Sequence, residues 1–174
     1  IEGPVMLYNL PAFTTPISTG LALRLIESVP NIIGIKDSSG KLDTLKAIKA
    51  RPDLNAHPIL VHDLALGDAL AANCIETAIS GLAGIMPELI ASMFEAHRSE
   101  QTEQVALLAG WVQEFIAEMD RLPFPVAMKL AARCRGLLNP QLALPLSQRQ
   151  QQVAEEFESW FSTFQPRLES LRQA

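Results

Sequence analysis

The stretch that decides the fold is residues 32–40, which read IIGIKDSSG. Residues 32–36 are mostly β-branched and apolar, a pattern that predicts a strand buried on both faces. The serines and glycine at 38–40 predict a turn, and residues 41–50 have the pattern of a helix. A strand, a turn and a helix in this order form the repeating unit of a parallel α/β sheet.

The same unit recurs on either side of this stretch. Short apolar runs predict three more strands, at residues 4–10 (PVMLYNL), 58–62 (PILVH) and 77–80. Helical patterns follow them, and we expect these helices at residues 18–27, with Ser18 as the cap, 67–73 and 87–97. Because strand–helix alternation implies parallel pairing, the sequence predicts four βα units.

Two architectures contain such units. Four βα units are half of a (β/α)8 barrel, and they also occur in an open doubly wound sheet. No Gly-x-Gly-x-x-Gly motif follows any of the four predicted strands. This weakens the dinucleotide-binding form of the open sheet.

The second half of the chain has a different pattern. Residues 88–174 show helical periodicity without strands. We expect helices at 101–119 and 126–134, a loop at 139–145, and a last helix capped by Ser147.

Aromatic side chains recur at helical spacing in this last helix, which favours a role in the core or in an oligomer contact over a ligand site. They are Phe157, Trp160, Phe161 and Phe164. We therefore predict two domains: residues 1–100 as the second half of a (β/α)8 barrel, and residues 101–174 as a C-terminal helical subdomain.

Composition excludes several classes of function. The 174 residues are 48% hydrophobic and carry a formal net charge of −5, which disfavours nonspecific binding to nucleic acid. We find no apolar run long enough for a membrane span and no pattern of a signal peptide. Cys74 and Cys134 lack CxxC spacing, so we expect two packed, reduced thiols in a cytoplasmic protein.

The chain opens on Ile1 and enters a strand almost at once, so we expect it to be a fragment of a longer protein. Half a barrel has two unpaired sheet edges. Residues 1–174 alone are therefore expected to be insoluble or associated through those edges, and catalytically silent.

Lys36 is the first residue expected to carry chemistry. It ends a β-branched strand, so its amine is expected at the carboxyl end of the sheet, where α/β enzymes place their sites. An amine in an apolar setting is more easily deprotonated, and the neutral amine attacks ketones. The alternative is a surface lysine that begins a loop and pairs with Asp37.

Tyr8 is the second such residue, and it is the only tyrosine in the chain. It ends the preceding strand, so it is expected at the same end of the sheet as Lys36. A phenol beside an imine carbon can carry protons to and from the hydroxyl group that forms and collapses there. The alternative is an aromatic residue of the core.

The two residues and their flanks form a pair of motifs, residues 8–11 (YNLP) and 34–40 (GIKDSSG). Together they resemble the dihydrodipicolinate synthase / N-acetylneuraminate lyase family, whose members carry Tyr-Asn-x-Pro and Gly-x-Lys-(Asp/Glu)-x-(Ser/Thr)-Gly at two strand ends. The resemblance continues through residues 126–129 (VAMK) and 145–147 (PLS).

The resemblance implies a (β/α)8 barrel followed by a helical subdomain, in a homotetramer. It also implies class I aldolase chemistry on pyruvate or a related 2-keto acid, with no metal and no organic cofactor. Carried over by residue, Lys36 is the Schiff-base nucleophile and Tyr8 the general acid and base. The backbone of Ile79 lines the pyruvate pocket, and Gly81 lets the backbone approach the ligand.

Asp63 stands where sugar-acid members of the family bind the hydroxylated tail, although it is otherwise an ordinary loop acid. Three positions depart from the family pattern. Phe13 replaces the usual arginine of dihydrodipicolinate synthases, Leu64 replaces a glutamate of sialic acid lyases, and Val61 replaces a glycine. The first two changes argue against aspartate semialdehyde and N-acetylneuraminate as good substrates.

The first interpretation is therefore an enzyme, a Schiff-base lyase of the aldolase or dehydratase type. The second is a non-catalytic relative that binds a keto acid or forms oligomers, and imine formation separates the two. A third, a nucleotide-binding doubly wound domain, has no phosphate loop in the sequence.

Overall fold

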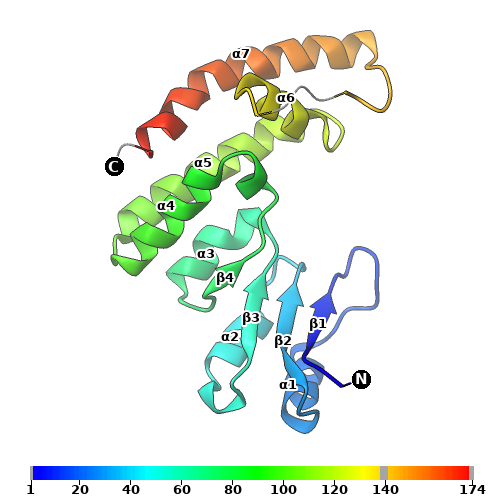
Figure 1. Ribbon diagram of the computed structural model, residues 1–174, viewed down its shortest axis with the longest axis vertical. Coiled ribbons are helices and arrows are strands. Elements are labelled where there is room, and N and C mark those ends of the chain that lie inside the picture. The colour runs from blue at the N-terminus through cyan, green and yellow to red at the C-terminus, as the bar shows by residue number, and fades with distance from the viewer. Residues whose placement is uncertain (1, 138–140, 173–174) are drawn as a thin grey trace. The chain divides into compact units, whose positions relative to one another are not determined.

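A computed structural model describes residues 2–137 and 141–172, so the first two residues of the predicted loop at 139–145 lie outside the described residues. The chain divides into two compact units, Ile1–Ser80 and Gly81–Ala174. Figure 1 shows strands and helices alternating in the first unit, and helices alone in most of the second.

The first unit is built on a parallel sheet of four strands in the order β1-β2-β3-β4. The strands are β1 (Val5–Asn9), β2 (Ile32–Asp37), β3 (His57–Leu60) and β4 (Thr77–Ala78). The helices between them are α1 (Thr19–Ser28), α2 (Asp43–Lys49) and α3 (Leu66–Ala71), with 3-10 turns η1 (Pro52–Leu54) and η2 (Asp63–Ala65). The predicted parallel order of consecutive βα units is confirmed.

The two faces of this sheet differ in burial because successive side chains of a strand point to opposite sides. On one face Ile35 and Leu60 are buried, and α1 and α2 pack against the strands, with Leu45 and Ile48 of α2 also buried. The partners Tyr8 and Lys36 lie on the other face, where Tyr8 is 46% exposed. Helices therefore cover the first face, and the second is the one available for chemistry.

Gly34 is required where β2 pairs with β3. Its φ is +153°, and it lies opposite His57 in the strand register. A Cβ atom at Gly34 would lie 2.2 Å from the carbonyl oxygen of His57 and 2.8 Å from its nitrogen. Since both of these atoms are backbone, no side-chain rotation relieves the contact. The close pairing two residues before Lys36 therefore depends on glycine.

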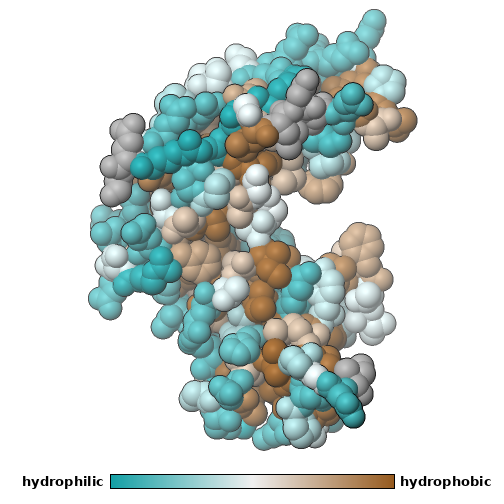
Figure 2. Space-filling view, in the orientation of Figure 1, coloured by the Kyte–Doolittle hydropathy of each residue, from teal (hydrophilic) through white to brown (hydrophobic). Residues whose placement is uncertain are grey.

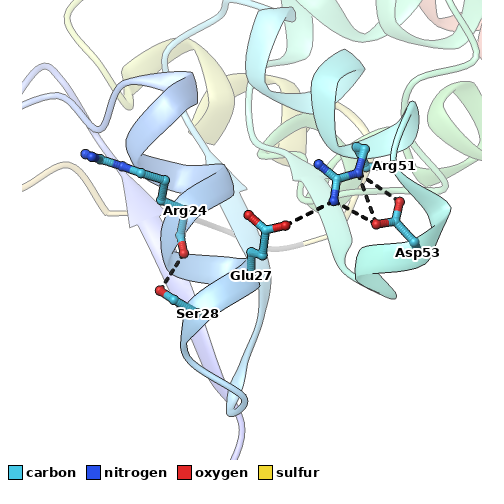
Figure 3. A network of polar contacts seen from close by, with 5 residues as sticks. All are labelled: Arg24, Glu27, Ser28, Arg51 and Asp53. Atoms are coloured by element: carbon cyan, nitrogen blue, oxygen red, sulfur yellow. Dashed lines mark hydrogen bonds and ion pairs between the residues drawn. The ribbon is translucent and has the colours of Figure 1, made fainter.

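Charged residues join the end of α1 to the segment after α2 (Figure 3). Arg51 Nη2 donates to Asp53 Oδ2 at 2.7 Å and to Glu27 Oε1 at 3.3 Å. Asp53, and then Glu27, raise the pKa of the Arg51 guanidinium, and Arg51 lowers the pKa of Asp53. Ser28 Oγ donates to the Arg24 carbonyl, which closes the last turn of α1. All these groups are exposed, so their main effect is on geometry rather than stability.

The second unit has four α-helices in its described part, and no strand appears there. They are α4 (Pro87–Arg98), α5 (Thr102–Met119), α6 (Val126–Cys134) and α7 (Gln148–Ser170), preceded by a 3-10 turn η3 (Leu82–Gly84). Ser147 caps α7 as predicted, through a capping box with Gln150. None of the helices in the described ranges is long and apolar enough to cross a membrane.

The aromatic residues of α7 form the core of this unit together with Phe115 of α5. Phe115 contacts four of them, with ring centroids 6.0 to 6.2 Å apart: Phe157, Trp160, Phe161 and Phe164. Trp160 Nε1 donates to Glu114 Oε1 at 3.3 Å, which satisfies its polar edge. The prediction that these residues are core rather than ligand contacts is confirmed for Phe157, Phe161 and Phe164, which are fully buried.

A buried ion pair joins the start of α4 to the end of α6. The side chains of Glu88 and Arg135 are only 7% and 5% exposed. Arg135 donates both to Glu88 Oε1 and to the Ile85 carbonyl oxygen, and the exposed Arg172 lies 3.5 Å from the same carboxylate oxygen. Glu88 Oε2 is buried without a hydrogen-bond partner among the described residues.

The boundary between the two units lies at residue 80/81, whereas we predicted a domain boundary after residue 100. The difference concerns α4, which packs closely against α5 and so belongs with the helical unit. The division into a barrel half, residues 1–100, and a helical subdomain, residues 101–174, stays a prediction.

The two cysteines differ in their surroundings. Cys74 is buried, and desolvation raises the pKa of its thiol. Cys134 is exposed at the end of α6, beside Glu158. The expectation of two packed thiols is therefore wrong for Cys134, because the last residue of an amphipathic helix can lie beside solvent.

Candidate active site

Tyr8 and Lys36 are brought together by the parallel register of β1 and β2. Their Cα atoms are direct partners, so both side chains leave the sheet on the same face. Lys36 Nζ lies 3.8 Å from the centroid of the Tyr8 ring, within the range of a cation–π contact. The structure thus makes neighbours of a nucleophilic amine and a phenol, 28 residues apart in sequence, at the carboxyl end of parallel strands.

Asp37 lies on the opposite face from Lys36, so the two do not pair, and the alternative of a surface Lys36–Asp37 pair is wrong. Asp37 is 1% exposed and accepts hydrogen bonds from Asn9 Nδ2 at 3.2 Å and from the backbone N–H of Ser39 at 2.7 Å. Asn9 Oδ1 in turn accepts from the N–H of Ile17 at 3.0 Å.

This buried polar pair fixes the two strand ends that carry the amine and the phenol. Asn9 and Asp37 are themselves register partners, one position beyond Tyr8 and Lys36. Sequence reasoning missed their role, although both belong to the quoted motifs. The signal was available: polar residues that directly follow an inward-facing position must lie on the helix-covered face, where they need partners.

The Tyr8 phenol is altered by its neighbours. The Ser38 hydroxyl, and then Lys36, hold the pKa of Tyr8 below its ordinary value, against the opposing effect of desolvation. The ring is 46% exposed, so the alternative of a core aromatic is wrong. A phenol that releases its proton more readily is a better general base near neutral pH.

Exposed apolar side chains that follow three of the strands form an apolar rim at this end of the sheet. We use this name for Phe13, Leu64 and Ile79, which are 83%, 44% and 48% exposed. Phe13 is held in a turn by its N–H, which donates to the Leu10 carbonyl at 3.0 Å, and Ile79 follows β4. Figure 2 shows brown surface beyond the end of β3 and a separate tan group beyond the end of β1, with teal and white surface between them. The three exposed side chains of the rim are therefore hydrocarbon.

The other predicted residues have ordinary local environments. Asp63 begins η2, where its carbonyl accepts from the N–H of Leu66. The His62 ring lies against Gly40, where φ is +73° and a Cβ would be 3.0 Å from the imidazole. Gly81 opens the second unit with φ −66° and ψ −36°, a conformation available to any residue. Roles for Asp63 and Gly81 in ligand binding stay predictions.

The chain is similar in sequence and in fold to known proteins. The profile of the dihydrodipicolinate synthetase family matches residues 2–163. A 4-hydroxy-tetrahydrodipicolinate synthase of Bacillus subtilis is 27% identical over 148 residues, which cover 82% of this chain and 49% of that protein. A protein of the same name from Helicobacter acinonychis is 31% identical over 156 residues, with coverage of 84% and 49%.

Among solved structures, N-acetylneuraminate lyase from Fusobacterium nucleatum, complexed with pyruvate, superimposes with a TM-score of 0.75. It is 20% identical, and the match covers 91% of this chain and 54% of that one. This likeness confirms the predicted fold class, four βα units of a (β/α)8 barrel followed by helices. The chain spans about half the length of the relatives that it matches.

Proposed function

This chain belongs to the dihydrodipicolinate synthetase family, and on that premise we propose that the whole protein is a Schiff-base-forming lyase for pyruvate or a related 2-keto acid. The observation that carries the proposal is the contact of Lys36 Nζ with the Tyr8 ring at 3.8 Å. A nucleophilic amine and an acid/base group at the carboxyl end of barrel strands are what imine chemistry requires.

In the first half of the reaction, the neutral amine of Lys36 attacks the keto carbon, and a proton passes from the amine nitrogen to the carbonyl oxygen to give a carbinolamine. The Tyr8 phenol donates a proton to the departing hydroxyl group, so that water leaves and a protonated imine forms. Tyr8 is then a phenolate, and the protonated imine on Lys36 stabilises it.

In the second half, the protonated imine accepts the electron pair of a breaking bond. For a 4-hydroxy-2-keto acid, the Tyr8 phenolate takes the proton of the C4 hydroxyl, the C3–C4 bond breaks, and an aldehyde leaves. The electron pair remains as an enamine on Lys36, which is then protonated at C3 and hydrolysed. Condensation is the same sequence in reverse.

The remaining assignments belong to the same proposal. The backbone of Ile79 and Gly81 lines the pyruvate pocket, and Asp63 and Phe13 face the outer part of the substrate. The proposal includes a homotetramer, which the family resemblance supports. It also includes a cytoplasmic location, which is consistent with the free cysteines Cys74 and Cys134. No metal or organic cofactor enters the proposed steps.

The first test is covalent trapping at Lys36. Incubation of the whole protein with pyruvate and borohydride should add a reduced pyruvyl group to Lys36, because borohydride reduces an imine to a stable amine. Lys36→Ala should abolish the label, whereas Lys41→Ala, five residues further along, should keep it. Peptide mass spectrometry gives the labelled position.

Tyr8→Phe serves as the companion variant in that assay. It should still form the trapped imine but turn over about a hundredfold more slowly, which is the size of a lost acid/base contribution. A label on another lysine would refute the assignment of Lys36. No label on any lysine would favour a non-catalytic relative.

The apolar rim leads to a prediction about the second substrate. A phenyl ring at Phe13 offers no charge-assisted hydrogen bonds, whereas an arginine fork would clamp a carboxylate. A polar tail would thus lose its water without gaining partners. We expect aspartate semialdehyde and N-acetylneuraminate to be poor substrates, and short 4-hydroxy-2-keto acids to have larger kcat/KM.

A panel of kcat/KM values on the whole protein measures this preference, and Phe13→Arg is the informative variant. It should raise kcat/KM for aspartate semialdehyde by about tenfold or more, the value of a charge-assisted contact, and change the neutral aldehydes little. If the unmodified protein condenses aspartate semialdehyde with pyruvate faster than any other pair, the specificity argument is wrong.

A further inference from the structure

Ser38 occupies an unusual position directly after β2. Its Oγ atom is buried and has no hydrogen-bond partner among the residues that the structure describes. A buried hydroxyl without a partner is unfavourable, and such groups in native structures call for an explanation.

The backbone around Ser38 is held on both sides. The N–H of Ser38 donates to the Asn9 carbonyl at 2.9 Å, and the N–H of Ser39 donates to Asp37 Oδ1 at 2.7 Å. Both bonds connect the turn to the buried Asn9–Asp37 pair at the ends of β1 and β2. The hydroxyl of Ser38 is therefore carried on a fixed backbone, and the absence of a partner does not reflect a loose loop.

The backbone holds Ser38 beside the end of β1 that carries Tyr8, because the N–H of Ser38 donates to the carbonyl of Asn9, the residue next to Tyr8, at 2.9 Å. Ser38 also lies two positions after Lys36, the register partner of Tyr8. Among the neighbours of Tyr8, Ser38 contributes most to the lowering of its pKa, ahead of Lys36. A hydroxyl donor has this effect because it stabilises the phenolate more than the phenol. The Ser38 hydroxyl has no hydrogen-bond partner among the described residues, so it is available to donate to the Tyr8 oxygen when Tyr8 gains charge.

We propose that Ser38 is a positioning residue for Tyr8, which donates its hydroxyl hydrogen to the Tyr8 oxygen whenever that oxygen has given up its proton. Ser38 keeps its own proton throughout, so no covalent bond of the serine breaks. The donated bond holds the phenolate beside Lys36 Nζ, in place for the next proton transfer. Its catalytic consequence rests on the proposed function, but the contact itself does not.

The charged groups around the Tyr8 phenol allow a change in its titration to be assigned to Ser38. Lys36 of β2 is the charged group that faces it. Asp37, the next residue of β2, lies on the opposite face and accepts a hydrogen bond from Asn9. Removing the Ser38 hydroxyl therefore leaves Lys36 as the main remaining influence on Tyr8.

The test is a titration of Tyr8 itself. Whole protein labelled with ¹³C at the tyrosine ζ carbon is followed by NMR against pH, and the resonance missing in Tyr8→Phe identifies Tyr8. The variants Ser38→Thr and Ser38→Val introduce side chains of nearly the same shape, but only the threonine side chain keeps the hydroxyl. We expect Tyr8 to titrate at higher pH in Ser38→Val and Ser38→Ala, and near its original pH in Ser38→Thr.

Ser39→Ala is the matched control, because the Ser39 hydroxyl is engaged with the N–H of Lys41 at 3.2 Å and should leave the titration unchanged. An unshifted Tyr8 titration in a folded Ser38→Val protein would overturn the proposal, and so would an equal shift in Ser39→Ala.

Kinetics separate this proposal from the proposed function. Ser38→Val should still form the trapped imine at Lys36, but its turnover should fall by about tenfold or more, as for one lost hydrogen bond to a charged group. The limb of its pH profile that depends on the Tyr8 phenolate should move to higher pH. A shifted titration with no label on Lys36 would support the Ser38–Tyr8 contact and reject the lyase chemistry.

Discussion

Gly34→Ala should destabilise the protein severely and remove Lys36 labelling at the same time. The new Cβ would lie 2.2 Å from the His57 carbonyl oxygen, so β2 and β3 must separate or Gly34 must leave φ +153°. Strain of this kind and the lost ladder bonds together cost about 3 kcal/mol or more. Urea denaturation followed by circular dichroism measures the loss, and pyruvate–borohydride trapping measures the effect on Lys36.

Gly110→Ala is the matched control for this substitution. Gly110 lies inside α5, and a Cβ there would meet no atom within 4 Å. Alanine in a helix interior is favoured over glycine by about 0.5–1 kcal/mol, so this variant should be slightly more stable than the original protein. If both variants unfold at the same urea concentration, the requirement for glycine at position 34 is disproved.

Arg135→Met should have an effect of similar size in the helical unit. The substitution leaves the Glu88 carboxylate buried, with only the exposed Arg172 nearby at 3.5 Å. An uncompensated buried charge costs about 3–5 kcal/mol. The urea midpoint of unfolding should fall accordingly, and Glu88→Leu combined with Arg135→Met should recover most of the loss, because the buried charge is then gone as well.

The neighbouring pair Arg133–Glu158 supplies the control from the same helix. Its side chains are 47% and 31% exposed, and exposed ion pairs contribute between about 0 and 1 kcal/mol. Arg133→Met should therefore change the urea midpoint little. Equal losses for Arg133→Met and Arg135→Met would show that burial does not decide the strength of these pairs.

Much of the first unit could be predicted from local pattern. The sequence predicts β2 at residues 32–36, and the structure has it at Ile32–Asp37. The agreement is close because a short β-branched run between two turns favours a strand over a helix. The ends were less certain. α2 begins at Asp43 rather than residue 41, since the N–H of Lys41 bonds to Ser39 Oγ and prolongs the turn. β3 ends at Leu60 because the His62 carbonyl accepts from the N–H of Ala65 and starts a 3-10 turn.

The candidate site was predicted in part for the same reason. Tyr8 and Lys36 each end an apolar strand, and parallel pairing of consecutive strands makes such ends neighbours. The sequence did not reveal which face each polar residue takes, so Asp37 was considered as a partner of Lys36. It gave no sign of Arg135 and Glu88, which are 47 residues apart and meet only through the packing of α4 and α6.

The alternation of faces along β1 and β2 also separates two kinds of evolutionary constraint. Asn9 and Asp37 anchor the scaffold, and any exchange there disturbs a buried pair. Tyr8 and Lys36, one position earlier, lie on the other face, where we propose that the reactant binds. A substitution at the rim, for example at Phe13 after β1, does not alter the hydrogen bonds of Asn9 and Asp37. On the proposed function, substitutions at this rim can therefore change which aldehyde is accepted without changing the buried pair that stabilises the fold.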